Sequence, residues 1–217
     1  MHERDADAGV VPLEEALIVN DPAYRRRLML SMLTEEPDAY LAQLQAAKLN
    51  DDVEVAHYAA TAVAQISKES DLKLQQLERA FKTDPSAQNL NEYCDFLGEY
   101  QGSGLAEGRV AQIQRQQYAR LLARRCERED TLELRIRYAT ALADVGQIDE
   151  AQAVTDQLVL DVLEEQEVWM LCLRLAVMRR DGDEVHRVID AIDKQHVYLS
   201  ADNREKLAFW RDGEEAR

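Results

Sequence analysis

The stretch LELRIRYATALADVGQIDEAQAVTDQLVLDVL, residues 132–163, decides the fold. Apolar residues recur at intervals of three and four on both sides of Gly146, which is the pattern of two amphipathic helices. Gly146 marks the turn between them, because glycine favours tight turns. The stretch therefore predicts two antiparallel helices joined by a short turn.

This stretch resembles a tetratricopeptide (TPR) repeat. When Gly146 is placed at the turn glycine of that family, Asp149-Glu150-Ala151 falls on its Asp-Glu-Ala motif. Leu142, Leu158 and Val159 then occupy positions where the family has large apolar residues. The resemblance implies a helical repeat that stacks on similar neighbours.

Three positions depart from the TPR pattern. Arg135 stands where an aromatic residue is usual, Thr155 stands where a bulky residue is usual, and no proline ends the unit near Leu163. The departures affect the detail of the repeat and leave the prediction of a helix–turn–helix unit in place.

Similar patterns lie on both sides of this unit. Apolar stripes at 90–97 and 110–122 flank a glycine-containing turn, and stripes at 168–178 and 185–192 flank Asp181-Gly182-Asp183. The register after residue 164 is open by one or two positions. Ser200 precedes a last helix that contains Leu207 and Trp210. We predict TPR-like helical repeats over residues 84–212, ending in a C-terminal capping helix.

The first part of the chain has a different period. Aligning Asp21 with Asp52 places Tyr24 over Val55 and Leu28 over Ala59, which gives an internal repeat of 31 residues that resembles HEAT repeats. We predict a disordered lead-in over residues 1–11 and HEAT-like repeats over 12–83, with a new helix beginning at Ser70-Asp71. The predicted fold class is all-α, an α-solenoid of antiparallel helix pairs that are HEAT-like and then TPR-like.

Charge and cysteine content limit the classes of function. The formal net charge of −16 disfavours binding to nucleic acid or anionic lipid, which repel a chain of this sign. Three cysteines without a CxxC spacing indicate a reducing, cytoplasmic compartment. No apolar run approaches the roughly 20 residues that span a bilayer, so we predict no direct insertion into a membrane.

The motifs of the common catalytic and cofactor sites are missing from the sequence. The glycines form no phosphate-binding loop, and neither HExxH nor GxSxG occurs. The four histidines have no ligand-like spacing with cysteine or with each other. We therefore predict a protein that is not an enzyme and that has no catalytic residues, no metal site and no cofactor.

Stacked helix pairs form a concave groove lined by the first helix of each pair. Such a groove mixes acidic, small and apolar residues here, which suits a peptide or a helix of a partner protein. The predicted partner-binding residues are Asn89, Glu92, Phe96, Glu133, Ile136, Thr140 and Ala143. A regulatory sensor that binds a peptide or a small ligand in the same groove is the alternative.

Three further blocks carry a second resemblance: VPLEEALIVND at 11–21, AKLNDDVEVAHYA at 47–59 and GSGL at 102–105. They resemble the cytoplasmic helical-repeat region of the E component of Pel-type exopolysaccharide systems. The resemblance implies a non-catalytic interaction scaffold in a bacterial biofilm polysaccharide synthase. It also implies contact with membrane-bound synthase subunits, namely the receptor subunit and the glycosyltransferase.

Members of that family carry transmembrane helices ahead of this region. The resemblance therefore implies either the cytosolic part of a membrane-anchored parent or a protein recruited to the inner face of the membrane. The sequence leaves the identity of the partner and the oligomeric state open.

Overall fold

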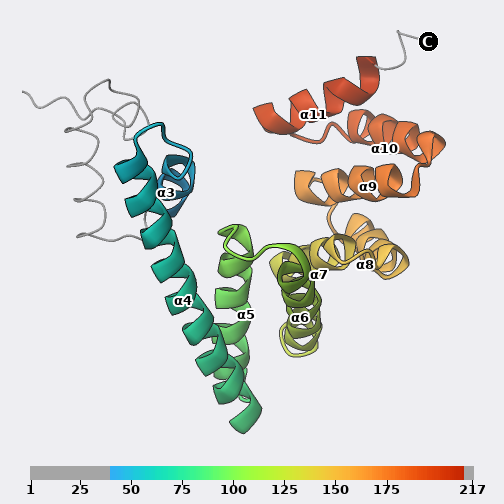
Figure 1. Cartoon of the computed structure of the whole chain (residues 1–217). Helices are drawn as coiled ribbons and strands as arrows, with labels where there is room; N and C mark the ends of the chain where they lie inside the picture. The colour runs from blue at the N-terminus through green and yellow to red at the C-terminus, as the bar shows by residue number, and fades with distance from the viewer. Residues whose placement is uncertain (1–39, 213–217) are drawn as a thin grey trace, which may run out of the picture. The chain divides into compact units, whose positions relative to one another are not determined.

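The computed structural model describes residues 40–212, and all regular secondary structure in this range is helical (Figure 1). The prediction of an all-α fold of antiparallel helix pairs is therefore confirmed for the described part of the chain. The predicted lead-in 1–11 and the helices expected within 12–33 lie outside the described residues. No helix within 40–212 is both long enough and apolar enough to cross a bilayer.

The chain divides into two compact units. The first contains residues 40–84 and 99–106 of the described range, with helices α3 (Leu41–Ala47) and α4 (Val53–Thr83). Asp52 begins α4, because its side chain accepts hydrogen bonds from the backbone N–H groups of Glu54 (2.9 Å) and Val55 (3.5 Å). The core between the two helices contains Leu44, Ala47, Val55, Ala59, Ala62 and Ile66.

The prediction of a new helix at Ser70-Asp71 is wrong, because α4 continues through this point to Thr83. Neither glycine nor proline occurs between residues 53 and 83, so nothing in the stretch favours a break. The Asp71 carboxylate accepts a hydrogen bond from the Tyr100 hydroxyl at 2.8 Å. Asp71 therefore bonds to a side chain elsewhere in the first unit and does not begin a helix, contrary to the sequence-based prediction.

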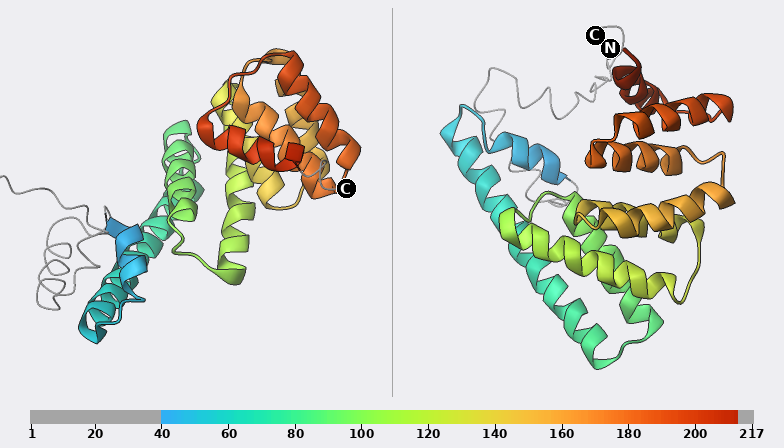
Figure 2. Two further views of the ribbon diagram at one scale, coloured as in Figure 1. Left: turned by 90° about the horizontal axis from the view of Figure 1, so that it is seen from above. Right: turned by 90° about the vertical axis from the view of Figure 1, so that its right-hand side faces the viewer.

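The second unit contains residues 85–98 and 107–212. Its helices are α5 (Ala87–Gly102, of which 87–98 belong to this unit), α6 (Gly108–Cys126), α7 (Leu132–Asp144), α8 (Ile148–Asp161), α9 (Gln166–Arg179), α10 (Gly182–Lys194) and α11 (Ala201–Asp212). From α6 to α10 each helix packs on the next, and the views of Figures 1 and 2 show them stacked as successive antiparallel pairs.

A register of 34 residues relates the pair α7–α8 to the pair α9–α10. Helices α7 and α9 begin at residues 132 and 166, and α8 and α10 begin at 148 and 182, so both offsets are 34. The connecting residues are equivalent as well, because Gly146 has a φ of 80° and Arg180 a φ of 58°. This offset settles the register after residue 164, and it places the second turn at Arg180, just before the predicted Asp181-Gly182-Asp183.

The first helices of the pairs lie on the inner side of the stack. Helix α7 packs on α9 as well as on α8, whereas α8 and α10 make no comparable contact. One core cluster joins α7, α8 and α9, and it includes Ala139, Leu142, Leu158 and Leu175. A second cluster joins α9, α10 and α11 and includes Trp169, Ile189 and Leu207. Successive pairs therefore share a continuous core, as stacked helical repeats do.

Candidate functional site: the inner face of the second unit

Helices α5, α7 and α9 each leave one side open to solvent, and together these sides form what we call the inner face. On each helix its residues recur at intervals of three or four, which places them on one side. The inner face consists of Glu92 and Asp95 on α5, Glu133, Arg137, Thr140 and Asp144 on α7, and Glu167, Met170, Arg174 and Met178 on α9. All of these side chains are half-buried or exposed.

Two ion pairs cross the inner face from one first helix to the next. Arg137 of α7 donates to Asp95 of α5 at 3.1 Å, and Arg174 of α9 donates to Asp144 of α7 at 2.5 Å. In both cases an arginine reaches back to an aspartate of the preceding first helix. The pairs therefore tie the three first helices together along the surface that a partner would meet.

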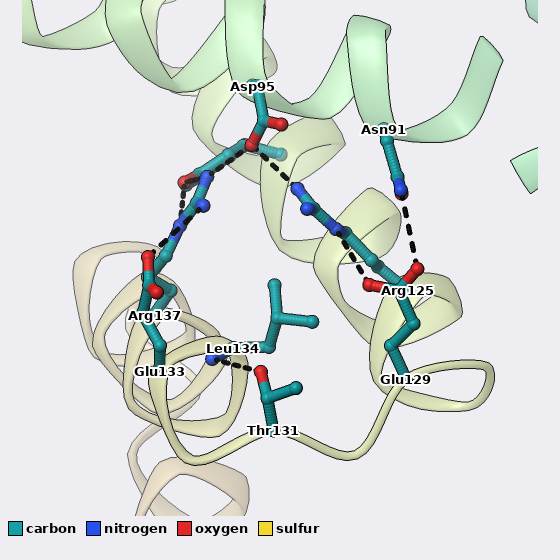
Figure 3. A network of polar contacts seen from close by, with 9 residues as sticks. Asn91, Asp95, Arg125, Glu129, Thr131, Glu133, Leu134 and Arg137 are labelled. Carbon is teal, nitrogen blue, oxygen red and sulfur yellow. Dashed lines mark hydrogen bonds and ion pairs between the residues drawn. The ribbon is translucent and has the colours of Figure 1, made fainter. Parts of the chain in front are cut away.

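Asp95 accepts hydrogen bonds from two arginines and is the centre of a polar network (Figure 3). Its Oδ1 also accepts from Arg125 Nη1 of α6 at 2.6 Å. The arginine side chains are only 14% (Arg125) and 29% (Arg137) exposed, whereas that of Asp95 is 45% exposed. Because charge-assisted bonds gain strength away from water, this carboxylate fixes α5, α6 and α7 relative to one another.

Tyr118 also holds the guanidinium group of Arg137 in place. Its hydroxyl accepts from Arg137 Nε at 3.2 Å and from Nη2 at 2.9 Å. Gly98 makes room for this ring, since a Cβ at position 98 would lie 2.9 Å from the Tyr118 hydroxyl oxygen. Burial raises the pKa of Tyr118, although the bond from Arg137 opposes the shift, so the hydroxyl keeps its proton at neutral pH.

The charge of Arg137 is secure for a related reason. Burial alone would lower the pKa of this guanidinium, but the hydrogen bonds to Tyr118 and Asp95 outweigh it and the net pKa is raised. Arg137 is therefore charged at neutral pH. The network positions α5, α6 and α7 relative to one another.

The structure separates the residues that the sequence predicts for the groove. Glu92, Glu133 and Thr140 lie on the inner face. Ile136 and Ala143 instead pack into the core shared by α7, α8 and α9, where Ala143 is 1% exposed. The two remaining residues of α5, Asn89 and Phe96, are half-buried beside the inner face.

Sequence reasoning missed the arginine–aspartate pairs. A signal for them exists, because an aspartate precedes its arginine partner by 30 residues three times. The pairs are Asp95 with Arg125, Asp144 with Arg174, and Asp149 with Arg179. Opposite charges at an interval close to the repeat length indicate contacts between neighbouring helices of a stack.

A cleft of about 340 Å³ lies on the other side of α7, between α6 and α8. Tyr138 and Leu142 line it together with the polar side chains of Gln116, Arg120 and Glu150. Burial raises the pKa of Tyr138, and the charge of Glu150 adds to the shift. The cleft therefore presents a neutral hydroxyl and mixed charges, without a nucleophile activated by a base.

No group of three or more His, Cys, Asp or Glu side chains within residues 40–212 is arranged to hold a metal ion. Cys94 and Cys172 are buried, and burial raises the pKa of Cys172 to about 12. Burial also raises the pKa values of Cys94 and Cys126. All three cysteines are therefore protonated thiols at neutral pH, which are poor nucleophiles and poor metal ligands.

Comparisons with known proteins add one structural likeness. No protein-family model matches the sequence, and no curated protein matches it significantly. A solved structure titled "MamA MSR-1 C2" is similar with a TM-score of 0.48 and 17% sequence identity, over 80% of this chain and 95% of that one. At this identity and overlap the likeness says nothing about function.

Proposed function

We propose that the protein is a non-catalytic scaffold that binds a segment of another protein along the inner face. The observation that carries this proposal is the 34-residue register between α7 and α9. It sets Glu133 level with Glu167 and Thr140 level with Arg174, so a segment lying across the two helices meets equivalent positions in succession. Repeating surfaces of this kind suit long peptides and helices.

The inner face is organised before any partner arrives. The ion pairs Asp95–Arg137 and Asp144–Arg174 already hold neighbouring first helices in place. A partner that binds a rigid surface has less conformational entropy to remove, so more of the contact energy appears as affinity. Met170 and Met178 supply adaptable apolar contacts between the charged positions, because the unbranched thioether chain adjusts to different shapes.

The finer part of the proposal is that the scaffold serves a bacterial exopolysaccharide synthase and contacts its membrane-bound subunits. This part is supported by the sequence blocks that resemble the Pel E component. The block at 47–59 covers the α3–α4 corner of the first unit, and Leu105 of the block at 102–105 packs on the same core. Gln45 Nε2 also donates to the Ser103 carbonyl oxygen at 3.1 Å. These two blocks belong to the first unit, and the inner face belongs to the second.

The test compares two double variants with the same change of charge. Glu92→Lys/Glu133→Lys alters the inner face, and Asp183→Lys/Asp190→Lys alters exposed positions on α10. Each protein, full length, is used to capture partners from a lysate of its own cells, and the captured proteins are quantified by mass spectrometry. Circular dichroism checks that both variants keep the helix content of the native chain.

We expect at least one partner to be depleted about tenfold or more, a loss of about 1.4 kcal/mol, by the inner-face variant and to be retained by the α10 variant. Equal retention by both variants, or equal loss, would contradict binding at the inner face. Polysaccharide-synthase subunits among the depleted partners would support the finer proposal, and unrelated proteins alone would remove it.

A further inference from the structure

Three large side chains of the second unit are exposed where a second helix leads to the next helix, one in the last turn of α8 and two in connections. Leu160 is 82% exposed and Leu163 is 44% exposed at the α8–α9 connection, and Tyr198 is 77% exposed at the α10–α11 connection. Exposed apolar side chains that gather on one part of a surface mark contacts with other molecules.

Hydrogen bonds link these two connections through the start of α9. Trp169 Nε1 donates to the Leu163 carbonyl oxygen at 2.8 Å, which holds the α8–α9 connection against α9. The Gln166 side chain at the start of α9 accepts from the Ser200 backbone N–H at 2.8 Å and from Asn203 Nδ2 at 3.1 Å. Figure 1 shows the α8–α9 and α10–α11 connections on the same side of the stack.

The α6–α7 connection continues this surface. Arg135 in the first turn of α7 reaches Asp161 at the end of α8 at 2.6 Å and Asp130 in the α6–α7 connection at 3.8 Å. We call residues 127–130, 160–165 and 196–202 together the acidic edge. It contains seven acidic residues, one arginine and one histidine.

Within residues 40–212, four of the seven acids of the acidic edge, Glu129, Asp130, Asp161 and Asp202, form ion pairs with arginine or lysine, and three do not. Glu127, Glu164 and Glu165 are exposed and form no ion pair with any residue in 40–212. Glu164 and Glu165 therefore place negative charge without an ion pair directly beside the exposed Leu163.

We propose that the acidic edge binds a basic amphipathic segment of a partner protein. Apolar side chains of that segment contact Leu160, Leu163 and Tyr198, while its lysines and arginines face Glu164 and Glu165. Charge complementarity selects this occupant. Nucleic acids and anionic bilayers are repelled, and a second copy in a two-fold arrangement would bring the same acidic residues against each other.

The test uses a fluorescent 14-residue peptide of leucine and lysine, with the leucines at helical spacing, and the full-length protein. Fluorescence anisotropy measures its affinity for the native chain, for Glu164→Lys/Glu165→Lys and for Asp183→Lys/Asp190→Lys, which has the same net charge. We expect the first variant to weaken binding about tenfold and the second to change it less than about twofold. Equal weakening by the two variants would show attraction to net charge alone and would overturn the proposal.

Two further arms test the apolar contacts and the identity of the occupant. Leu160→Ser/Tyr198→Ser should weaken binding about fivefold at constant charge, and a peptide with the same composition in scrambled order should bind about as weakly. Unchanged affinity in either case would overturn the proposal.

A peptide of residues 21–34 of this chain, which contains Arg25-Arg26-Arg27, serves as the competitor. If it binds more tightly than the leucine–lysine peptide, the occupant is the chain's own segment and the proposal of a partner fails. Because Glu92 and Glu133 lie outside the acidic edge, loss of binding at the inner face and loss of binding here are measured independently.

Discussion

The pairs α7–α8 and α9–α10 share one register but fill it with different side chains. Where α7 has the small Ala139 and the large Leu142, α9 has the large Leu173 and the small Ala176, and all four are at most 3% exposed. The large and the small core residue therefore occupy opposite positions in α7 and α9, one helical turn apart. The spacing of the helices along the chain is the same in both pairs. Turns and periodicity set the repeat, and the total volume of the core is met by more than one arrangement.

The same comparison holds at the edge of each pair. Arg135 in α7 and Trp169 in α9 are equivalent, yet the arginine makes surface ion pairs and the indole is 6% exposed in the core. The aromatic position that the first pair lacks is thus occupied in the second. At this position the pair α7–α8 has the ion pairs of Arg135, where the pair α9–α10 has the packed ring of Trp169.

The largest predicted effect is on the free energy of unfolding, and it compares the ring of Trp169 with the ion pairs of Arg135. Trp169→Ala removes a buried ring and its hydrogen bond to the Leu163 carbonyl, and we expect it to lower the free energy of unfolding by about 3–5 kcal/mol. Arg135→Ala removes partly exposed ion pairs to Asp161 and Asp130, and we expect a loss of about 1 kcal/mol or less. Urea denaturation followed by circular dichroism measures both, and equal losses would contradict the comparison.

Sequence reasoning succeeded where the structure depends on neighbouring residues. The turn at Gly146 depends on local sequence, and it occurs as predicted. The break predicted at Asp71 failed because its side chain finds Tyr100, which lies 29 residues away in sequence. A residue that favours a cap is tolerated within a helix when a distant partner satisfies it, and no local pattern contains that information.

The candidate site shows the same division. Glu133 and Thr140, which helical periodicity assigned to one side of α7, are exposed and half-buried, respectively. Periodicity did not exclude Ala143, because the positions that α9 covers depend on how the next pair packs. The partners of Arg137 and Arg174 lie on other helices, 42 and 30 residues away, so periodicity within one helix could not identify them.

A double-mutant cycle tests whether the large and the small residue of the α7 core can change places without loss of packing. Leu142→Ala alone opens a cavity and should cost about 2–5 kcal/mol, and Ala139→Leu alone overpacks the core and should cost about 1–3 kcal/mol. The double variant reproduces the order found at Leu173 and Ala176. We expect its cost to be smaller than the sum of the single costs by about 1 kcal/mol or more, measured by urea denaturation. Strict additivity would show that the two cores are not interchangeable.

The smallest predicted effect concerns the two turns, which differ in sequence but share their hydrogen bonds. The N–H groups of Gly146 and Gln147 donate to the carbonyls of Ala143 and Leu142, and those of Arg180 and Asp181 donate to the carbonyls of Val177 and Ala176. Both turns thus need a residue with a left-handed backbone conformation at the end of the first helix. Glycine adopts this conformation freely, and arginine adopts it only with strain.

Gly146→Ala should therefore destabilise the fold by about 1 kcal/mol, and Arg180→Gly should stabilise it by about 0.5 kcal/mol despite the entropy that glycine adds to the unfolded chain. Arg180→Ala is the control, since it removes the exposed side chain but keeps the strain and should leave the urea midpoint unchanged. If Arg180→Ala stabilised the protein as much as Arg180→Gly, the side chain and not the backbone would distinguish the two turns.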